Sequence, residues 1–272
     1  MVCAATASAT ECRSTPRGAN LAEAISGLEL LRRVELDNVR PWLRSGLRVL
    51  EIGGGTGYQA SLLADIGCEV LSIDLPRRAS SLQSRFHPVV EYDGRRLPVP
   101  DKSVDCVFSS NVLEHVHDLP EMLGEIRRVL KPGGLAIHIL PSATWRLWTS
   151  LAYFGYVFAV LVGKRVPYCD RVSGAHAGGV EGGVLRALVR FLLAPLRAHG
   201  AYANAIVELY CFSRRRWMRV FREQGFRLIA LRSNRLFYTG FVLFPRMSAG
   251  TRANMARWLG SSCHIYVSEP SR

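Results

Sequence analysis

Lysine is scarce in this chain of 272 residues, because only Lys102, Lys131 and Lys164 occur and arginine carries nearly all of the positive charge. Acidic residues are scarce in the second half. Residues 141–272 hold 19 Lys and Arg against five Asp and Glu, whereas residues 1–140 hold 16 against 17. A basic excess confined to one half indicates an anionic partner, such as a membrane surface, an acidic substrate or nucleic acid. An arginine-rich solvated surface would give the same composition.

The seven cysteines include no C-x-x-C pair, and their spacing is irregular. This pattern argues against a zinc site and against a disulfide framework. Residues 1–19 are rich in Ala, Ser and Thr and lack the apolar core of a secretory signal. We therefore expect a disordered tail over 1–19, a reduced, cytoplasmic setting, and no metal site.

No uncharged run reaches the roughly 20 residues that a membrane-spanning helix needs. The longest, Leu147–Gly163, has 17 residues and is rich in aromatic side chains. Three interpretations stay open: a short membrane span, a buried or lid helix, and a segment lying in the membrane interface. A full span is awkward, because the chain must return to the same side to complete its fold.

A glycine-rich stretch, Leu47–Pro76, contains the strongest local pattern in the chain. An apolar strand ending at Ile52 is followed by Gly53, Gly55 and Gly57, then by a segment with helical spacing of apolar residues. A second apolar strand, Val70–Ile73, ends on Asp74. Strand, glycine turn, helix, strand and acid together predict a nucleotide-binding βαβ unit.

The spacing of the glycines separates two classes of ligand. A dinucleotide-binding loop requires G-x-G-x-x-G or G-x-G-x-x-A, and Tyr58 occupies the last position of that pattern. The pattern here is E-x-G-x-G-x-G, beginning at Glu51. It resembles motif I of the class I S-adenosylmethionine-dependent methyltransferases. A methionine moiety carries an ammonium group, so an acid near the glycine turn is useful there.

The resemblance continues downstream and is specific to the type 11 methyltransferase family. The loop between Asp93 and Asp105 matches that family's pattern at Leu97, Pro98, Pro100, Asp101 and Ser103. The sequence S-N-V-L-E-H-V follows the next strand, and K-P-G-G, Lys131–Gly134, precedes another and is expected to be a turn. The prolines and Asp101 would also serve simply as turn formers.

This resemblance implies a Rossmann-like α/β fold with a seven-stranded, mostly parallel sheet, the class I methyltransferase fold. Residues 20–145 and 205–272 would form the S-adenosylmethionine-binding domain, and 146–204 an apolar and basic helical cap insertion. The cofactor would be S-adenosylmethionine. The residues implied to bind it are Glu51, Gly53, Gly55, Gly57, Asp74, Asp93, Gly94 and Asn111.

The resemblance also implies individual roles. Glu51 would serve the methionine end, directly or through water, and the three glycines would form the backbone floor. Asp74 would accept the ribose hydroxyls, which suits a carboxylate at a strand end. Asp93, with the Gly94 backbone, would hold the adenine, and Asn111 would line the methionine side.

Methyl transfer from a sulfonium needs alignment and water exclusion more than an elaborate catalytic constellation. An oxygen acceptor would profit from a base that titrates near neutrality. His115 is the first candidate for that base, with His117 second and His176 a further one; a structural role for His115 stays open. The apolar segment favours a small, hydrophobic, lipid-like acceptor and leaves open a peripheral contact with anionic membrane.

Other functions are less well supported. An NAD(P)-dependent Rossmann oxidoreductase is disfavoured by Tyr58 and by the absence of a Y-x-x-x-K pair. A non-catalytic S-adenosylmethionine-binding protein at a membrane surface stays open, because binding motifs do not report turnover. Nucleic-acid methylation is disfavoured, since S-N-V-L stands where an N-P-P-Y-like signature would be expected.

Overall fold

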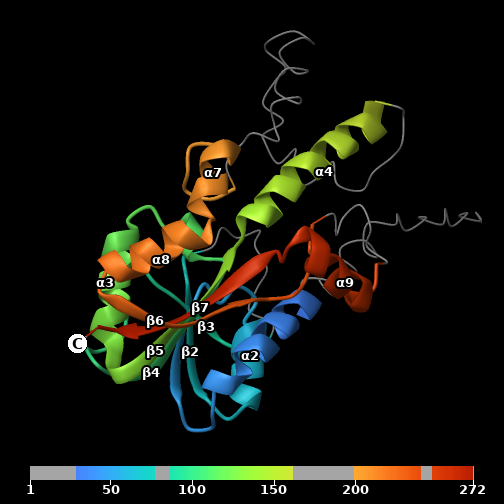
Figure 1. Cartoon of the computed structure of the whole chain (residues 1–272). Helices are drawn as coiled ribbons and strands as arrows, with labels where there is room; N and C mark the ends of the chain where they lie inside the picture. Colours follow the sequence, from blue (N-terminus) through green and yellow to red (C-terminus); the bar gives the residue numbers. More distant parts are fainter. Residues whose placement is uncertain (1–28, 77–85, 162–198, 240–246, 272) are drawn as a thin grey trace, which may run out of the picture.

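A computed structural model describes residues 29–76, 86–161, 199–239 and 247–271. Its centre is a seven-stranded sheet with the strand order β3-β2-β1-β4-β5-β7-β6, and helices lie on both faces (Figure 1). The predicted seven-stranded, mostly parallel sheet is therefore confirmed. The strands are β1 (Arg48–Ile52), β2 (Glu69–Asp74), β3 (Val89–Glu91), β4 (Val104–Ser110), β5 (Leu130–Pro141), β6 (Phe226–Ser233) and β7 (Cys263–Pro270).

The helices fall into two groups by the face of the sheet they cover. Residues 29–39 and α2 (Tyr58–Asp65) pack on one face, and α3 (Leu119–Val129) and α8 (Arg214–Glu223) pack on the other. The remaining described helices are η1 (Arg40–Trp42), η2 (Leu113–His115), α4 (Ala143–Leu161), α7 (Ala205–Cys211) and α9 (Ala249–Leu259).

Alternation along the central strands gives each face its own core. In β1, Val49 packs into one apolar cluster with Leu63 of α2, whereas Leu50 packs into the other with Leu123 of α3. Successive side chains of a strand point to opposite faces, so a parallel sheet covered on both sides must be apolar on both. Trp217 and Tyr266 are the largest fully buried side chains, and both belong to the Leu50 cluster.

Strand direction defines where a ligand can bind. β1 pairs in parallel with β2 on one side and with β4 on the other, while β7 runs antiparallel between β5 and β6. The chain order therefore reverses between β1 and β4. Open α/β sheets bind ligands at such a switch point, beyond the carboxyl ends of the strands.

One local expectation differs from the structure. The K-P-G-G segment is not a separate turn before its strand, because β5 already begins at Leu130 and runs through Lys131–Gly134. Its pairing with β4 shifts between Val104 and Cys106, and Gly133 takes a φ of 77°, so the turn residues are absorbed as an irregularity in the strand. Glu208 lies in a helix, α7, whose N-cap Asn204 accepts hydrogen bonds from Ile206 and Val207.

Residues 29–39 form a helix that ends just before η1, whereas the 1–19 tail and most of the 146–204 insertion lie outside the described residues. The apolar segment begins as α4. Among the helices in the described ranges, none has the length and apolar character needed to cross a membrane.

Candidate functional site

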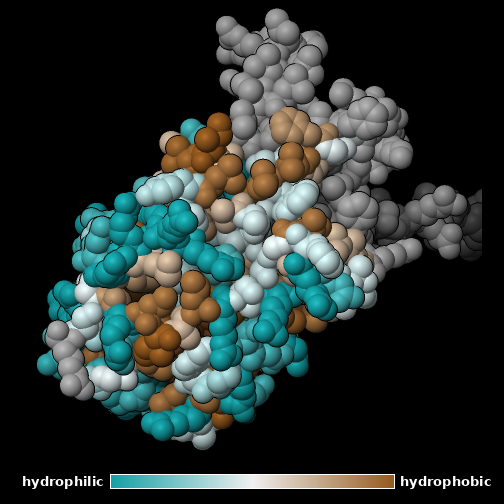
Figure 2. Space-filling view, in the orientation of Figure 1, coloured by the Kyte–Doolittle hydropathy of each residue, from teal (hydrophilic) through white to brown (hydrophobic). Residues whose placement is uncertain are grey.

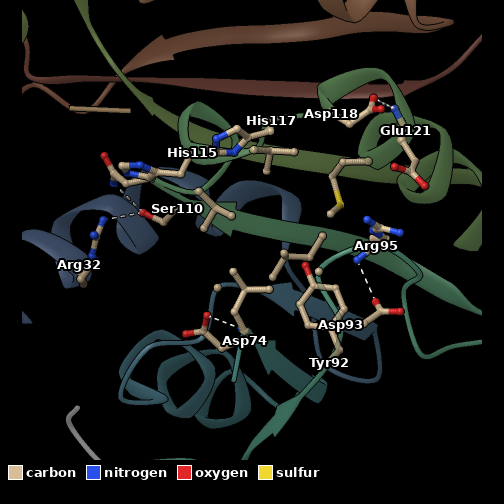
Figure 3. Close-up of a pocket in the computed structure, with 18 residues that line it drawn as sticks. Arg32, Asp74, Tyr92, Asp93, Arg95, Ser110, His115, His117, Asp118 and Glu121 are labelled. Atoms are coloured by element: carbon tan, nitrogen blue, oxygen red, sulfur yellow. Dashed lines mark hydrogen bonds between the residues drawn. The ribbon is translucent and has the colours of Figure 1, made fainter. Parts of the chain in front are cut away.

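A cavity of about 690 Å³ opens at the switch point between β1 and β4 (Figure 3). Its volume lies within the range of small-molecule and cofactor sites. It is bordered by the ends of β1, β2 and β4 and by the segments that follow β3 and β4. Of the nine predicted site residues, six line it: Gly53, Asp74, Asp93, Gly94, Asn111 and His115.

The glycine turn is fastened to the end of β2. The N–H of Gly55 donates to Asp74 Oδ2 at 2.9 Å, and the N–H of Leu75 donates to Asp74 Oδ1 at 2.8 Å. Gly53 has a φ of 80°, and a Cβ on it would collide with Val112. Glycine is therefore required at this position, because the backbone is left-handed and because a side chain would clash with its neighbour.

Glu51 lies beneath the turn and does not line the cavity. Its Oε2 accepts a hydrogen bond of 2.5 Å from Ser72 Oγ of β2. Burial raises the pKa of Glu51 to about 7, against the opposing effects of the Ser72 hydrogen bond and the charge of Arg32. Gly55 and Gly57 also lie outside the cavity lining, so three of the nine predicted site residues do not border the cavity.

Asp93 and Gly94 form the other wall, directly after β3. One oxygen of Asp93, Oδ1, accepts the N–H groups of Arg95 and Arg96 at 2.8 and 3.0 Å, so the carboxylate is held in a turn of its own making. Gly94 has a φ of 78° and faces the side chain of Leu75. Tyr92 lines the cavity beside them.

The loop after Asp93 is held by one arginine of α3. Arg128 donates to Asp101 at 2.7 Å, to Glu125 at 2.7 Å and to the carbonyls of Leu97 and Val99. Ser103 Oγ donates to the carbonyl of Pro100 at 2.6 Å. Apart from Asp93, the matching residues of this loop do not line the cavity, which supports a loop-forming role for Asp101 and Ser103.

Arg32 is a cavity residue that the sequence interpretation missed. It extends from the helix of residues 29–39, and its Nη1 donates to Glu35 Oε2 at 2.8 Å and to Ser110 Oγ at 2.7 Å. Glu35 is fully buried and also accepts from Ser110 at 3.0 Å. In the sequence, the signal that could have identified Arg32 was an arginine on the mostly apolar face of that helix. This helix therefore borders the cavity through Arg32.

Asn111 follows Ser110 at the end of β4 with a φ of 55°, a conformation that asparagine tolerates better than most residues. Its Nδ2 donates to Ser110 Oγ at 3.1 Å, and its Oδ1 accepts from the Cys263 thiol at 3.7 Å. The side chain is half-buried and faces the cavity.

Two of the predicted histidines line the cavity: His115 of the S-N-V-L-E-H-V segment, and His117 just after it. Partial burial lowers the pKa of His115, with the charge of Glu208 opposing it. A neutral imidazole at neutral pH is the form that accepts a proton. Its neighbour Glu114 is fully buried, and burial raises the pKa of that carboxyl to about 8. His176, the third candidate, lies outside the described residues.

Comparison with known proteins identifies this region. Residues 50–138 match the family model described as "Methyltransferase domain". The chain is 34% identical over 147 residues to the ubiquinone/menaquinone biosynthesis C-methyltransferase of Pseudomonas putida, covering 49% of this chain and 56% of that protein. It is 34% identical over 118 residues to a bifunctional biotin biosynthesis protein of Cellvibrio japonicus, covering 42% and 24%. The matches thus span well under two thirds of these relatives' lengths.

The fold is shared with solved structures as well. A SAM-dependent methyltransferase of Thermotoga maritima superposes with a TM-score of 0.52 over 94% of this chain and 97% of its own, at 18% identity. At that identity the likeness supports the fold alone.

Proposed function

We propose that the chain carries a domain of the S-adenosylmethionine-dependent methyltransferase family, and that the protein is an enzyme that methylates a small acceptor. The observation that supports the proposal is the cavity at the β1–β4 switch point, with the Asp74 carboxylate fastened to the glycine turn at its rim. S-adenosylmethionine supplies an already activated methyl group when bound. The chain's own task is to hold donor and acceptor in line and to exclude water.

The lining residues fit that donor. Asp74 would accept the ribose hydroxyls, and Asp93 would accept the adenine amino group beside Gly94. Asn111 would lie at the methionine side of the cavity. We add Arg32 there, because its guanidinium suits the methionine carboxylate. Glu51 would act through the turn or through water, as would Gly55 and Gly57 together with Gly53.

We further propose that the acceptor is small and hydrophobic. Leu147, Leu151 and Phe154 follow one face of α4, and each is more than 40% exposed. Ile206, Val207 and Tyr210 of α7, which packs against α4, are exposed too (Figure 2). Contiguous exposed apolar surface of this kind marks a binding surface. A relative whose name specifies ubiquinone and menaquinone biosynthesis supports the same acceptor class.

In this proposal residues 20–145 and 205–272 form the donor domain, and 146–204 covers the acceptor. A related proposal, the membrane version, is that the exposed apolar face of α4 and α7 contacts anionic membrane peripherally. Leu151→Asp should abolish flotation with anionic liposomes at low salt, while Trp258→Asp, on exposed α9, should not. No flotation of the unmodified protein would remove the membrane version only.

Calorimetric titration tests the donor proposal directly. S-adenosylhomocysteine should bind with a stoichiometry of one, and NAD(H) and NADP(H) should not bind. Transfer of a labelled methyl group to a panel of quinones and phenols then tests turnover. Binding of a nicotinamide dinucleotide in preference to S-adenosylhomocysteine would overturn the proposal.

His115→Ala tests the proposed base. If His115 takes a proton from an oxygen acceptor, turnover should fall by 100-fold or more, within the usual contribution of about 10² to 10⁴ for general bases. Affinity for S-adenosylhomocysteine should be retained. An unchanged turnover would leave His115 with a structural role.

A further inference from the structure

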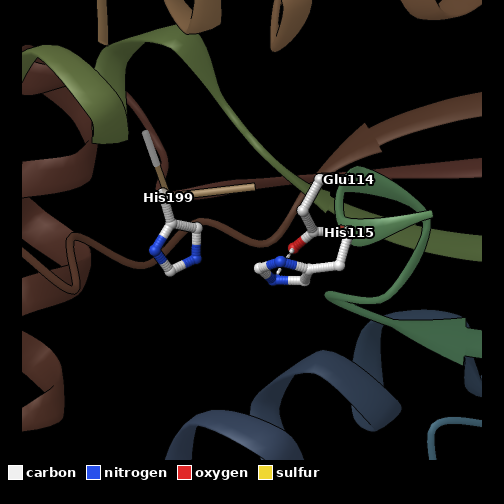
Figure 4. A group of neighbouring side chains, drawn as sticks. All are labelled: Glu114, His115 and His199. Carbon is white, nitrogen blue, oxygen red and sulfur yellow. Dashed lines mark ion pairs between the residues drawn. The ribbon is translucent and has the colours of Figure 1, made fainter. Parts of the chain in front are cut away.

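Glu114, His115 and His199 meet beside the cavity, although His199 is distant from the other two in sequence (Figure 4). Each offers one ligand atom, and these atoms lie within 4.8 Å of one another. The rings of His115 and His199 have their centroids 5.2 Å apart. We propose that these three side chains bind a divalent transition-metal ion, with Zn²⁺ as the best match.

The carboxylate of Glu114 is the strongest reason. Its side chain is fully buried, and neither oxygen has a hydrogen-bond partner among the described residues. His115 Nε2 lies 3.8 Å from its Oε1, beyond hydrogen-bond distance. A buried carboxylate without partners is costly, and buried charges are normally paired or coordinate metals.

The nearby guanidinium groups are already used by other carboxylates. Arg146 pairs with the fully buried Glu208 at 2.7 Å, and Arg32 pairs with Glu35 at 2.8 Å. A cation between Glu114 and the two imidazoles would supply the opposite charge that these pairs do not.

The backbone holds His199 at this place. Its N–H and that of Gly200 donate to Glu208 Oε1, both at 2.6 Å. The N–H of Ala201 donates to the carbonyl of Glu114 at 2.8 Å, and a Cβ on Gly200 would collide with that carbonyl. The Trp145 ring packs edge-on against the His199 ring at 4.8 Å. The two ligand-bearing segments are therefore fixed to each other before any ion binds.

The donor set fits zinc chemistry. Two imidazoles and one carboxylate, with a fourth position for water or substrate, form a recurrent catalytic Zn²⁺ site with bonds of about 2.0–2.2 Å. Tetrahedral geometry at those bond lengths separates ligand atoms by about 3.4 Å, so small side-chain rotations would close the site. His115 lines the cavity, and the ion's open position would face it. There, resting on the proposed function, the ion would bind an acceptor oxygen and favour its deprotonated form. With its lone pair on the ion, His115 would then act as a ligand and not as the free base.

Metal binding is tested without reference to activity. Tag-free, chelator-treated full-length protein is titrated with Zn²⁺ by calorimetry and with Co²⁺ by visible absorption. We expect one ion per chain and the intense d–d bands of low-coordinate Co²⁺. His199→Ala, His115→Gln and Glu114→Gln should each weaken binding by more than 100-fold, since even outer-shell partners contribute 10–100-fold. His117→Ala, the neighbouring exposed histidine, should bind as the unmodified protein does.

Three outcomes would overturn the proposal. The first is that the unmodified protein binds no stoichiometric Zn²⁺, and the second is that bound Co²⁺ shows the absorption bands of thiolate ligation. The third is that folded His115→Gln and His199→Ala bind Zn²⁺ with the affinity of the unmodified protein. Circular dichroism establishes that each variant is folded. If the unmodified protein binds Zn²⁺ but not S-adenosylhomocysteine, the proposed function is rejected and the metal site is not. If it binds S-adenosylhomocysteine but not Zn²⁺, only the metal site is rejected.

Discussion

Asp74 Oδ2 accepts the N–H of Gly55 at 2.9 Å, so the acid that ends β2 fastens the turn that follows β1. The same carboxylate lies at the rim of the cavity. One side chain therefore holds the turn and borders the cavity.

Asp74→Ala is predicted to abolish cofactor binding. It would remove two donor–acceptor pairs to the backbone and the acceptor for the ribose, and hydrogen bonds to charged groups contribute about 1.5–3 kcal/mol each. Calorimetry with S-adenosylhomocysteine measures the loss. Glu91→Ala, at the position paired with Asp74 in β3, is the control and should retain affinity. Unchanged affinity in Asp74→Ala would refute the ribose assignment.

Gly53→Ala is predicted to destabilise the fold and to eliminate cofactor binding. The added Cβ would meet Val112, and the backbone has a φ of 80°. Gly124→Ala is the matched control, because that helical glycine has open space around it. It should gain up to about 1 kcal/mol of stability. Urea unfolding of both variants compares them, and equal stability would argue against the strained turn.

The stability of the protein is predicted to fall as pH rises from about 4.5 to about 7. Burial raises the pKa of Glu51 to about 7, from an ordinary value of 4.5. The folded state therefore binds more protons than the unfolded state in that window, and the free energy of unfolding declines as pH increases.

Glu51→Gln should remove that contribution, which is worth about 3 kcal/mol at pH 8 by the size of the pKa shift. The variant should match the unmodified protein at pH 4 and exceed it at pH 8, measured by urea unfolding in the presence of a chelator. Glu114 titrates in the same direction up to about pH 8 and would leave a residual slope. Glu69→Gln, at an exposed position of β2, is the control. A pH profile unaltered by Glu51→Gln would contradict the prediction.

Arg32→Gln is predicted to weaken S-adenosylhomocysteine by tenfold or more, while leaving 5′-methylthioadenosine unaffected. The second ligand lacks the amino-acid end that the guanidinium is proposed to bind. Equal losses for the two ligands would instead indicate that the variant disturbs the site by leaving the buried Glu35 unpaired. Parallel calorimetric titrations distinguish these cases.

The donor half of the site was predictable because its residues are close in sequence. Gly53 and Asp74 belong to one βαβ unit, whose strand ends must meet in a parallel sheet. Arg32 and the contact of His199 with Glu114 were not predictable. They depend on how distant segments dock on the sheet, and local periodicity does not report that. K-P-G-G was misjudged because its glycines, normally turn formers, also fit an irregular strand.

Asp74 and Asp93 each hold nearby backbone N–H groups before any ligand arrives. If these residues bind adenosine as proposed, their site forms during folding, and little conformational entropy remains to be lost when a nucleoside binds. Donor exchange should then proceed at similar rates whether or not an acceptor is present. Substitutions in the segments above the sheet would then change the acceptor without altering the residues proposed to bind the nucleoside.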